Sequence, residues 1–274
     1  MIRALFFDLD GTLLSSEKRI PESARTAIAR CRERGVKVFF ATARSPRLRQ
    51  TLKWTDAEYA LFDGGVYANG GCVEFGGGMR HCYIDSRAVR ICIEQAARFE
   101  DVHLSLHTPQ EGYAFNFPVD DFLIEDWGLN GANIRRIDDA TIAETTKMMI
   151  FYDHLNDSHP LPEQLGHALQ TACAGLANVY ITDGGSSIQV TGVDSGKLKG
   201  IESIRRQLGL ETEEVCVFGD DVNDLEMISF YPNSVAMGNA VESIRQAAKF
   251  VTRTNDEDGV AFAIEMLLDG TGGV

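Results

Sequence analysis

The stretch that decides the fold is IRALFFDLDGTLL, residues 2–14. Residues 2–7 are apolar apart from Arg3, which predicts a strand buried on both faces. Asp8 and Asp10 follow directly, and side chains two positions apart share one face of a strand. Ligands of open parallel sheets bind at the carboxyl ends of the strands, so we expect both carboxylates to point into one site there.

Two neighbouring acids repel each other, which a fold tolerates mainly when a cation lies between them or one acid is protonated. Gly11 can adopt a positive φ and bring backbone N–H groups close to a bound anion. Asp-x-Asp alone is also compatible with an acidic turn. The full string Asp-x-Asp-Gly-Thr-Leu favours a ligand-binding or catalytic site over an acidic turn.

Two more predicted strands end in polar residues. Residues 20–35 read as a helix and residues 36–41 as a strand that ends at Thr42. Strand, helix, strand at this spacing is a βαβ unit, so the second strand should lie parallel to the first and bring Thr42 to the same edge. Residues 215–218 form a further buried strand that ends in Gly219-Asp220.

The string Asp8-Leu9-Asp10-Gly11-Thr12-Leu13 resembles the first motif of the haloacid dehalogenase superfamily, whose members mostly transfer phosphoryl groups through an aspartate. Residues 41–44, Ala-Thr-Ala-Arg, are similar to its second motif, with Ala43 where glycine is usual. Residues 219–227 resemble its fourth motif, and residues 235–261 look like the Cof-type branch. The resemblance covers about 1–80 and 191–268, and the segment between them fits that branch's α/β cap by position and element order only.

These observations predict an α/β protein with a Rossmann-like, doubly wound parallel-sheet core and an inserted α+β cap. We expect the core to comprise residues 1–82 and 191–274 and the cap to comprise residues 83–190. The cap assignment follows from alternating apolar segments, which indicate antiparallel strands with one wet face. Within the core, we expect Tyr59–Phe62 to be the third strand and residues 69–71 to form a hairpin turn.

His103, Ser105 and His107 would share one face of a cap strand. A zinc site there is conceivable, but no acid or cysteine lies beside them at ligand spacing, so we expect them to face solvent. Residues 183–187, Asp-Gly-Gly-Ser-Ser, are interpreted as a hairpin turn, and a substrate loop is the less favoured alternative.

The 274-residue chain carries a formal net charge of −14, which argues against nucleic-acid or anionic-membrane partners. The first predicted strand starts almost at Met1, so no signal peptide is expected, and no apolar run reaches the ~20 residues that span a bilayer. The six cysteines form no Cys-x-x-Cys pair, which favours reduced thiols. We expect a cytoplasmic protein that is a monomer or a homodimer.

The resemblance implies a Mg²⁺ cofactor and a set of site residues. Asp8 would be the nucleophile, Asp10 would protonate the leaving alcohol and later activate water, and Lys197 would offset negative charge. Lys199-Gly200 is a competing match for that lysine. The metal would be held by Asp8 and Asp220, by the backbone carbonyl at Asp10, and with Asp224 in or near the shell.

The phosphoryl oxygens would be oriented by Gly11 and its loop, Thr42 and Asn223. The Thr42 hydroxyl could equally close an ST-turn, and the local sequence does not separate the two roles. Arg44 either reaches the substrate or is a surface arginine. The crowding of carboxylates is expected to raise the pKa of the acid that donates the proton, Asp10.

We therefore expect a Mg²⁺-dependent phosphatase of small phosphorylated metabolites, such as sugar phosphates, that works through an aspartyl-phosphate. Two alternatives stay open. A phosphomutase would pass the phosphoryl group to a second substrate hydroxyl, and a regulatory phosphoacceptor would keep it without turnover.

Overall fold

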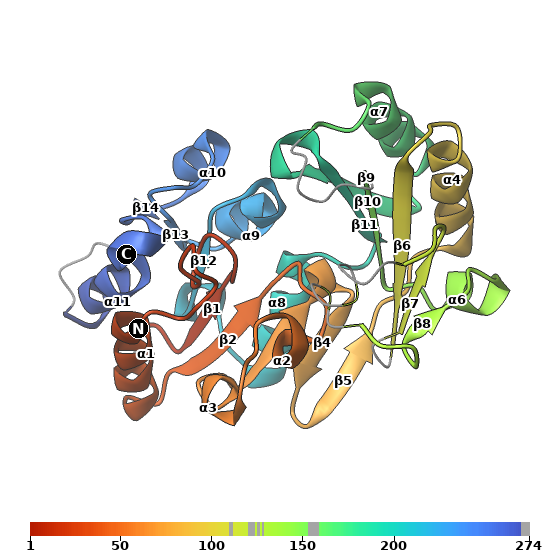
Figure 1. Ribbon diagram of the computed structural model, residues 1–274. Coiled ribbons are helices and arrows are strands. Elements are labelled where there is room, and N and C mark those ends of the chain that lie inside the picture. The colour runs from red at the N-terminus through yellow and green to blue at the C-terminus, as the bar shows by residue number, and fades with distance from the viewer. Residues whose placement is uncertain (110–111, 120–123, 125–126, 128, 153–158, 270–274) are drawn as a thin grey trace.

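The computed structural model describes residues 1–109, 112–119, 124, 127, 129–152 and 159–269, which form two sheets with helices on their faces (Figure 1). The larger sheet has eight strands in the order β14-β13-β12-β1-β2-β3-β4-β5. Neighbours from β14 to β3 pair in parallel, and β4 and β5 pair antiparallel. The bounds are β1 Ala4–Phe7, β2 Lys37–Ala41, β3 Gly64–Tyr67, β4 Cys72–Phe75, β5 Gly78–His81, β12 Val215–Gly219, β13 Asn233–Ala236 and β14 Phe250–Val251. The predicted fold class is confirmed.

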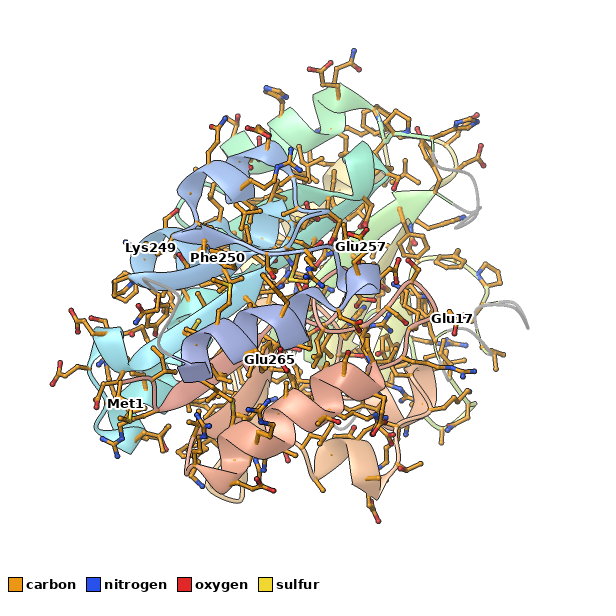
Figure 2. All side chains as sticks on the ribbon, turned by 90° about the vertical axis from the view of Figure 1, so that its left-hand side faces the viewer. Met1, Glu17, Lys249, Phe250, Glu257 and Glu265 are labelled. Carbon is orange, nitrogen blue, oxygen red and sulfur yellow. The ribbon has the colours of Figure 1, made fainter. Side chains whose placement is uncertain are left out.

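The central strand β1 is buried on both faces because its side chains alternate between two helical layers. Leu5 and Phe7 pack with the layer of α1 and α11, which run side by side (Figures 1 and 2), and Ala4 and Phe6 pack with α8 and α9. Asp8 follows Phe6 by two positions and therefore points toward the layer that contains α8. The core helices are α1 Glu22–Glu33, α2 Leu48–Thr51, α3 Asp56–Tyr59, α8 Lys197–Leu208, α9 Leu225–Phe230, α10 Glu242–Ala247 and α11 Gly259–Asp269.

The smaller sheet, called the cap sheet below, has six strands in the order β10-β11-β9-β6-β7-β8 and is mostly antiparallel. One face packs against α4 and α7 through apolar side chains that include Leu104, Met148 and Ile188. The opposite face is turned toward the core (Figure 1). The bounds are α4 Ser86–Ala96, β6 Val102–Thr108, β7 Gly112–Phe115, β8 Ile134–Arg135, α6 Asp139–Ala143, β9 Lys147–Tyr152, α7 Glu163–Ala172, β10 Ala177–Thr182 and β11 Ser187–Gly192.

The prediction of a third strand over Tyr59–Phe62 is wrong. Residues 56–59 are the helix α3, and the third strand is β3, Gly64–Tyr67. Thr55 caps α3 and Glu58 hydrogen bonds back to the Thr55 N–H, so a capping box decides the helix. The hairpin turns at residues 69–71 and 183–187 are confirmed as connections between antiparallel strands. Across the described ranges, no helix is both long and apolar enough to cross a membrane.

Candidate active site

Three segments that are distant in sequence meet at the carboxyl edge of the eight-stranded sheet. β1 ends before Asp8, β12 ends before Asp220, and Lys197 is the first residue of α8. The Lys197 Nζ lies 2.7 Å from Asp8 Oδ1 and 2.7 Å from Asp224 Oδ1. Lys199 instead donates a hydrogen bond to the Val193 carbonyl and is exposed. Lys197 is therefore the lysine that contacts the carboxylates.

The approach of the two strand ends requires a glycine at position 11. Gly11 has φ +74°, and a Cβ there would lie 2.2 Å from Asp220 Oδ2. The next residue, Thr12, donates a hydrogen bond of 2.6 Å to Asp220 Oδ1. Gly11-Thr12 thus joins the first motif to the fourth through close packing and one hydrogen bond.

Asp8 and Asp220 have raised pKa values. For Asp8, burial is the main cause, and repulsion by Asp224 and Asp220 adds to it although Lys197 acts in the opposite direction. Burial and the charge of Asp224 raise the pKa of Asp220 to about 7. Burial opposes the charged form of Lys197, but attraction to Asp224 and Asp8 outweighs it and raises the pKa of Lys197. One lysine therefore does not neutralise this cluster.

A divalent cation would supply the positive charge that this cluster of carboxylates lacks. Asp8, Asp220 and Asp224 each offer a carboxylate oxygen, and these atoms lie within 4.8 Å of one another. Carboxylate oxygens are the ligands that Mg²⁺ prefers. Asp224 is already occupied, because its Oδ2 accepts the N–H groups of Asp220 and Asp221 while its Oδ1 accepts from Lys197. The geometry favours Asp8 and Asp220 as direct ligands, with Asp224 holding the lysine and the loop.

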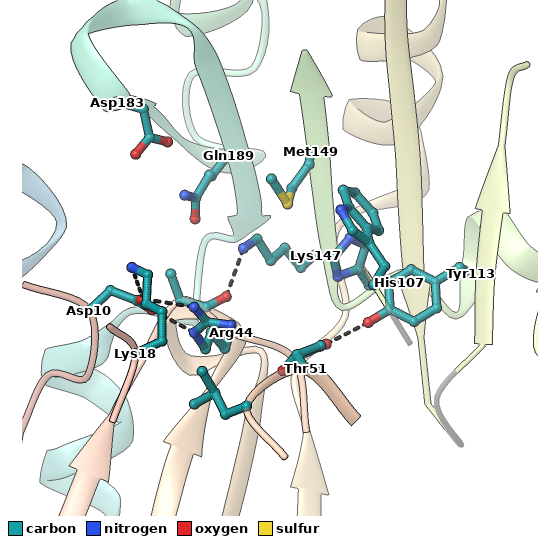
Figure 3. A pocket seen from close by; sticks show the side chains of 14 residues that line it. Asp10, Lys18, Arg44, Thr51, His107, Tyr113, Lys147, Met149, Asp183 and Gln189 are labelled. Carbon is teal, nitrogen blue, oxygen red and sulfur yellow. Dashed lines mark hydrogen bonds and ion pairs between the residues drawn. The ribbon is translucent and has the colours of Figure 1, made fainter. Parts of the chain in front are cut away.

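The Asp10 side chain lies apart from that cluster. It forms a bidentate pair with Arg44, at 2.6 and 2.7 Å, and a third contact of 2.7 Å with Lys18 (Figure 3). Burial raises the pKa of Asp10, but the hydrogen bonds and charges of Arg44 and Lys18 outweigh it and lower the pKa to about 2. The expectation that crowding raises this pKa is wrong, because two cations surround the carboxylate.

Thr42 lies at the end of β2, as predicted, and its side chain is buried. Its Oγ1 accepts a hydrogen bond of 3.1 Å from the Arg44 N–H, which is the ST-turn alternative. The hydroxyl proton stays available to another acceptor. Thr42 therefore shapes the turn that carries Arg44 and can still donate to a ligand.

Asn223 belongs to a chain of amides that crosses from the core to the cap sheet. Its Nδ2 donates to Asn69 Oδ1 at 3.1 Å, and the Asn69 Nδ2 donates to Gln189 Oε1 at 2.9 Å. Gln189 in turn donates to Thr182 Oγ1 at 3.2 Å. The position of Asn223 is thus linked to the two cap strands β10 and β11.

Two adjoining cavities lie between the core and the cap. The carboxylate cavity, about 340 Å³, is lined by Asp8, Asp10, Gly11, Asp220 and Asn223 on the core side and by Asp183 from the cap. The cap cavity, about 500 Å³, is lined by Arg44 and Ser45 of the core and by His107, Tyr113, Lys147 and Met149 of the cap. Both cavities share Asp10, Lys18, Ala43, Asp183 and Gln189, so they are continuous. Figure 3 shows the lining of the cap cavity.

The cap side of the site is what the sequence interpretation missed. Ser105 and His107 are buried, so their expected exposure to solvent is wrong. They lie on the cap-sheet face that is turned to the core, and in antiparallel strands His107 is directly opposite both Tyr113 and Lys147. Two signals were available: the substrate-loop alternative at residues 183–187, since Asp183 lines both cavities, and Lys147, a charged residue at the start of the otherwise apolar strand KMMIFY.

Comparisons with known proteins identify hydrolases and phosphatases as relatives of this chain. The family model of haloacid dehalogenase-like hydrolase matches residues 5–264. The chain is 28% identical to the Bacillus subtilis (strain 168) 5-amino-6-(5-phospho-D-ribitylamino)uracil phosphatase YitU, over 93% of each chain. It is 26% identical to phosphoglycolate phosphatase 1 of Saccharolobus solfataricus, over 98% of this chain and 97% of the relative. Among solved structures, it is similar to the HAD subclass IIB sugar phosphatase BT4131, with a TM-score of 0.79, 26% identity, and coverage of 98% of this chain and 99% of that chain.

Proposed function

The chain belongs to the haloacid dehalogenase-like hydrolase family and is a phosphatase, and from this premise we propose that it is a Mg²⁺-dependent hydrolase of small phosphorylated metabolites that works through an aspartyl-phosphate. One observation carries the proposal: Asp8, Lys197 and Asp220 converge on one buried cluster at the edge of the sheet. Sugar phosphates are the substrate class named for one structural relative, and a ribitylamino-uracil phosphate is named for one sequence relative.

Asp8 is the nucleophile of this mechanism. Lys197 holds its Oδ1, and Asp8 lines the carboxylate cavity. An Asp8 oxygen forms a bond to phosphorus while the bond between phosphorus and the ester oxygen breaks. Water then attacks phosphorus, the bond to Asp8 breaks, and inorganic phosphate leaves with the Asp8 carboxylate regenerated.

Asp10 moves the protons in both steps. It gives a proton to the ester oxygen of the leaving alcohol and later takes one from the attacking water. With its pKa near 2, Asp10 is ready to act as a base, whereas its work as an acid requires weaker pairing with Arg44 and Lys18. A phosphate dianion that enters the site competes for those two cations, and that competition raises the pKa of Asp10.

Mg²⁺ would be held by the carboxylates of Asp8 and Asp220 together with the backbone carbonyl at position 10, and Asp224 would support the shell. When bound, it offsets the repulsion between a carboxylate and a phosphate dianion. Gly11, Thr42 and Asn223 orient the phosphoryl oxygens, and Arg44 binds the phosphoryl or the neighbouring part of the substrate.

We assign the reaction to the core and the selection of the leaving group to the cap, with the bounds expected from the sequence. Residues 1–82 and 191–274 form the catalytic core and residues 83–190 form the cap that selects the leaving group. We place the enzyme in the cytoplasm, as a monomer or a homodimer.

The test is hydrolysis of p-nitrophenyl phosphate by the purified protein. We expect turnover with Mg²⁺, loss of turnover with a chelator, and recovery when Mg²⁺ is restored. Transfer of the phosphoryl group to an added alcohol instead of water would favour a phosphomutase. Stable phosphorylation of the protein without release of phosphate would favour a regulatory phosphoacceptor. Turnover that is unaffected by the chelator would overturn the metal assignment.

A further inference from the structure

We propose that the cap cavity binds a planar heteroaromatic ring of the leaving group, so that the substrate is a phosphate ester of a hydroxylated chain or sugar that carries such a ring. This inference rests on the proposed function, because it places the phosphoryl group in the carboxylate cavity. It goes further by naming what the other cavity selects.

The two cavities suit a substrate longer than a simple sugar phosphate. The carboxylate cavity of about 340 Å³ holds the acids and Asn223. The cap cavity adds about 500 Å³, within the range of about 300–1,000 Å³ typical of small-molecule sites. A phosphoryl group placed against Asp8 therefore leaves room for a leaving group that passes Arg44 and continues under the cap sheet (Figure 3).

The far wall of the cap cavity is aromatic. His107 and Tyr113 lie on neighbouring strands with ring centroids 4.5 Å apart, and Trp127 lies 5.8 and 5.9 Å from them. Met149 adds a thioether to the same lining. Such a surface gains most from contact with a flat unsaturated ring, through stacking or edge-to-face contact and through burial.

The charged and the aromatic side chains of the cap cavity lie at opposite ends, with Arg44 and Asp183 toward the carboxylate cavity and His107 and Tyr113 at the far wall (Figure 3). The Nε2 of His107 contacts Ser105 Oγ at 3.1 Å, whereas its buried Nδ1 has no hydrogen-bond partner among the described residues. The Lys147 Nζ donates to the Ala43 carbonyl at 2.7 Å, and the Tyr113 hydroxyl pairs with Ser45 Oγ at 2.5 Å. Apart from that nitrogen, the polar groups of the far wall are thus paired within the protein, so a flat ring suits that wall, whereas a hydroxylated chain finds partners nearer Arg44, Asp183 and Gln189.

A heterocycle needs only one or two polar partners. Burial, with the charges of Lys147 and Arg47, holds the pKa of His107 well below its usual value, so the imidazole is neutral. Lys147, directly opposite His107, can donate a further hydrogen bond.

The experiment compares matched esters that differ only by the ring. Uridine 5′-monophosphate is paired with ribose 5-phosphate, and riboflavin 5′-phosphate with ribitol 5-phosphate, which places the ring at two distances from phosphorus. We expect kcat/KM for the ring-bearing ester to exceed that of its partner by about tenfold or more in at least one pair. Equal or lower values for the ring-bearing ester in both pairs would overturn the inference.

Variants of the aromatic wall test whether the preference for ring-bearing esters arises in the cap cavity. Trp127→Leu and His107→Leu each remove one ring of the wall. Each should lower the ratio between the paired substrates about three- to tenfold. Phe117→Leu is the matched control, because Phe117 belongs to the same aromatic cluster without lining the cavity. A ratio that both cavity variants leave unchanged would contradict the assignment.

A binding measurement separates this inference from the proposed function. Calorimetric titration of the Asp8→Asn protein with the same pairs, in the presence of Mg²⁺, compares their affinities without turnover. Tighter binding of the ring-bearing ester supports the subsite even if no ester is hydrolysed. Hydrolysis of p-nitrophenyl phosphate without any ring preference would instead leave the proposed function intact and refute the subsite.

Discussion

The carboxylate cavity and the cap cavity share five lining residues but are assembled in different ways. The carboxylate cavity collects residues that directly follow strands, such as Asp8 and Asp220, and Lys197 at the start of α8 contacts Asp8 from behind this lining. The cap cavity collects residues within antiparallel strands, where the pairing register puts His107 beside Tyr113 and Lys147. The residues that react are thus positioned by the ends of parallel strands, whereas the residues that contact the leaving group are positioned by the pairing register of antiparallel strands.

This difference predicts that substitutions at the two cavities have different signatures. Changes in the carboxylate cavity should lower kcat for every substrate, because they alter the reacting groups. Changes at His107, Tyr113 or Trp127 in the cap cavity should alter KM and the ratio between substrates, because these side chains contact only the leaving group.

The largest effect is expected for Asp8→Asn. The amide preserves the shape of the side chain but removes the nucleophile, so kcat should fall by at least about 10⁴-fold for every substrate. Steady-state assays with Mg²⁺ measure it, and Asp194→Asn on the exposed surface serves as the control. A residual rate within tenfold of the wild type would show that another group attacks phosphorus.

Lys197→Met should also lower stability, because it leaves the buried carboxylates of Asp8 and Asp224 without their cation. Loss of one partner of a buried ion pair costs about 3–5 kcal/mol. Urea unfolding without Mg²⁺ measures this cost, and Lys199→Met, whose lysine is exposed, should change the free energy of unfolding by less than about 0.5 kcal/mol. Equal effects of the two substitutions would remove the distinction between these lysines.

Lys147→Met tests the cap cavity through pH. Burial, only partly offset by attraction to Asp183, lowers the pKa of Lys147 from 10.5 to about 7. Between these values the unfolded chain binds a proton that the folded protein does not, so lysine lowers stability as pH falls. Relative to the wild type, the variant should therefore gain on the order of a few kcal/mol as the pH falls toward 7, and no more below it.

Urea unfolding of both proteins at several pH values from about 9 to about 6 brackets this pKa near 7. Lys249→Met, at an exposed lysine, should show a constant difference from the wild type over that range. A constant difference for Lys147→Met as well would mean that this lysine keeps its ordinary protonation in the folded state.

The smallest effect is expected for Gln189→Leu, which breaks the chain of amides between Asn223 and the cap. It leaves the buried Nδ2 of Asn69 without its acceptor. We expect KM to rise about fivefold while kcat stays within about twofold, since one hydrogen bond between the halves is lost. Gln207→Leu on the exposed surface of α8 is the control. A loss of kcat with an unchanged KM would place Gln189 among the groups that stabilise the transition state.

The same difference explains how much could be predicted from the sequence. The placement of Asp8, Gly11 and Asp220 follows from apolar runs that stop at polar residues, because parallel strands end at a common edge. The motif alignment favoured Lys197 over Lys199, and α8 shows why only one of them reaches the carboxylates: positions two apart lie on opposite faces of a helix, and Lys197 is buried whereas Lys199 is exposed. Tyr59–Phe62 was misassigned because its apolar content outweighed the capping box at Thr55.

The cap residues could not be predicted because their neighbours are distant in sequence. Alternation correctly indicates that His107 and Ser105 share one face of β6, but it does not say whether that face meets water or the core. The pKa of Asp10 depends in the same way on Arg44, which is 34 positions away and forms its bidentate pair only in the folded chain.

The central claim is that Asp8 becomes phosphorylated during turnover. The direct measurement uses the Asp10→Asn protein with Mg²⁺ and p-nitrophenyl phosphate, whose weakly basic leaving group needs no acid, whereas hydrolysis of the intermediate still lacks its base. After an acid quench, peptide mass spectrometry should find the phosphoryl group on Asp8. The double variant that also carries Asp8→Asn should give no phosphorylated peptide. Release of p-nitrophenol without phosphorylation of Asp8 would contradict the account.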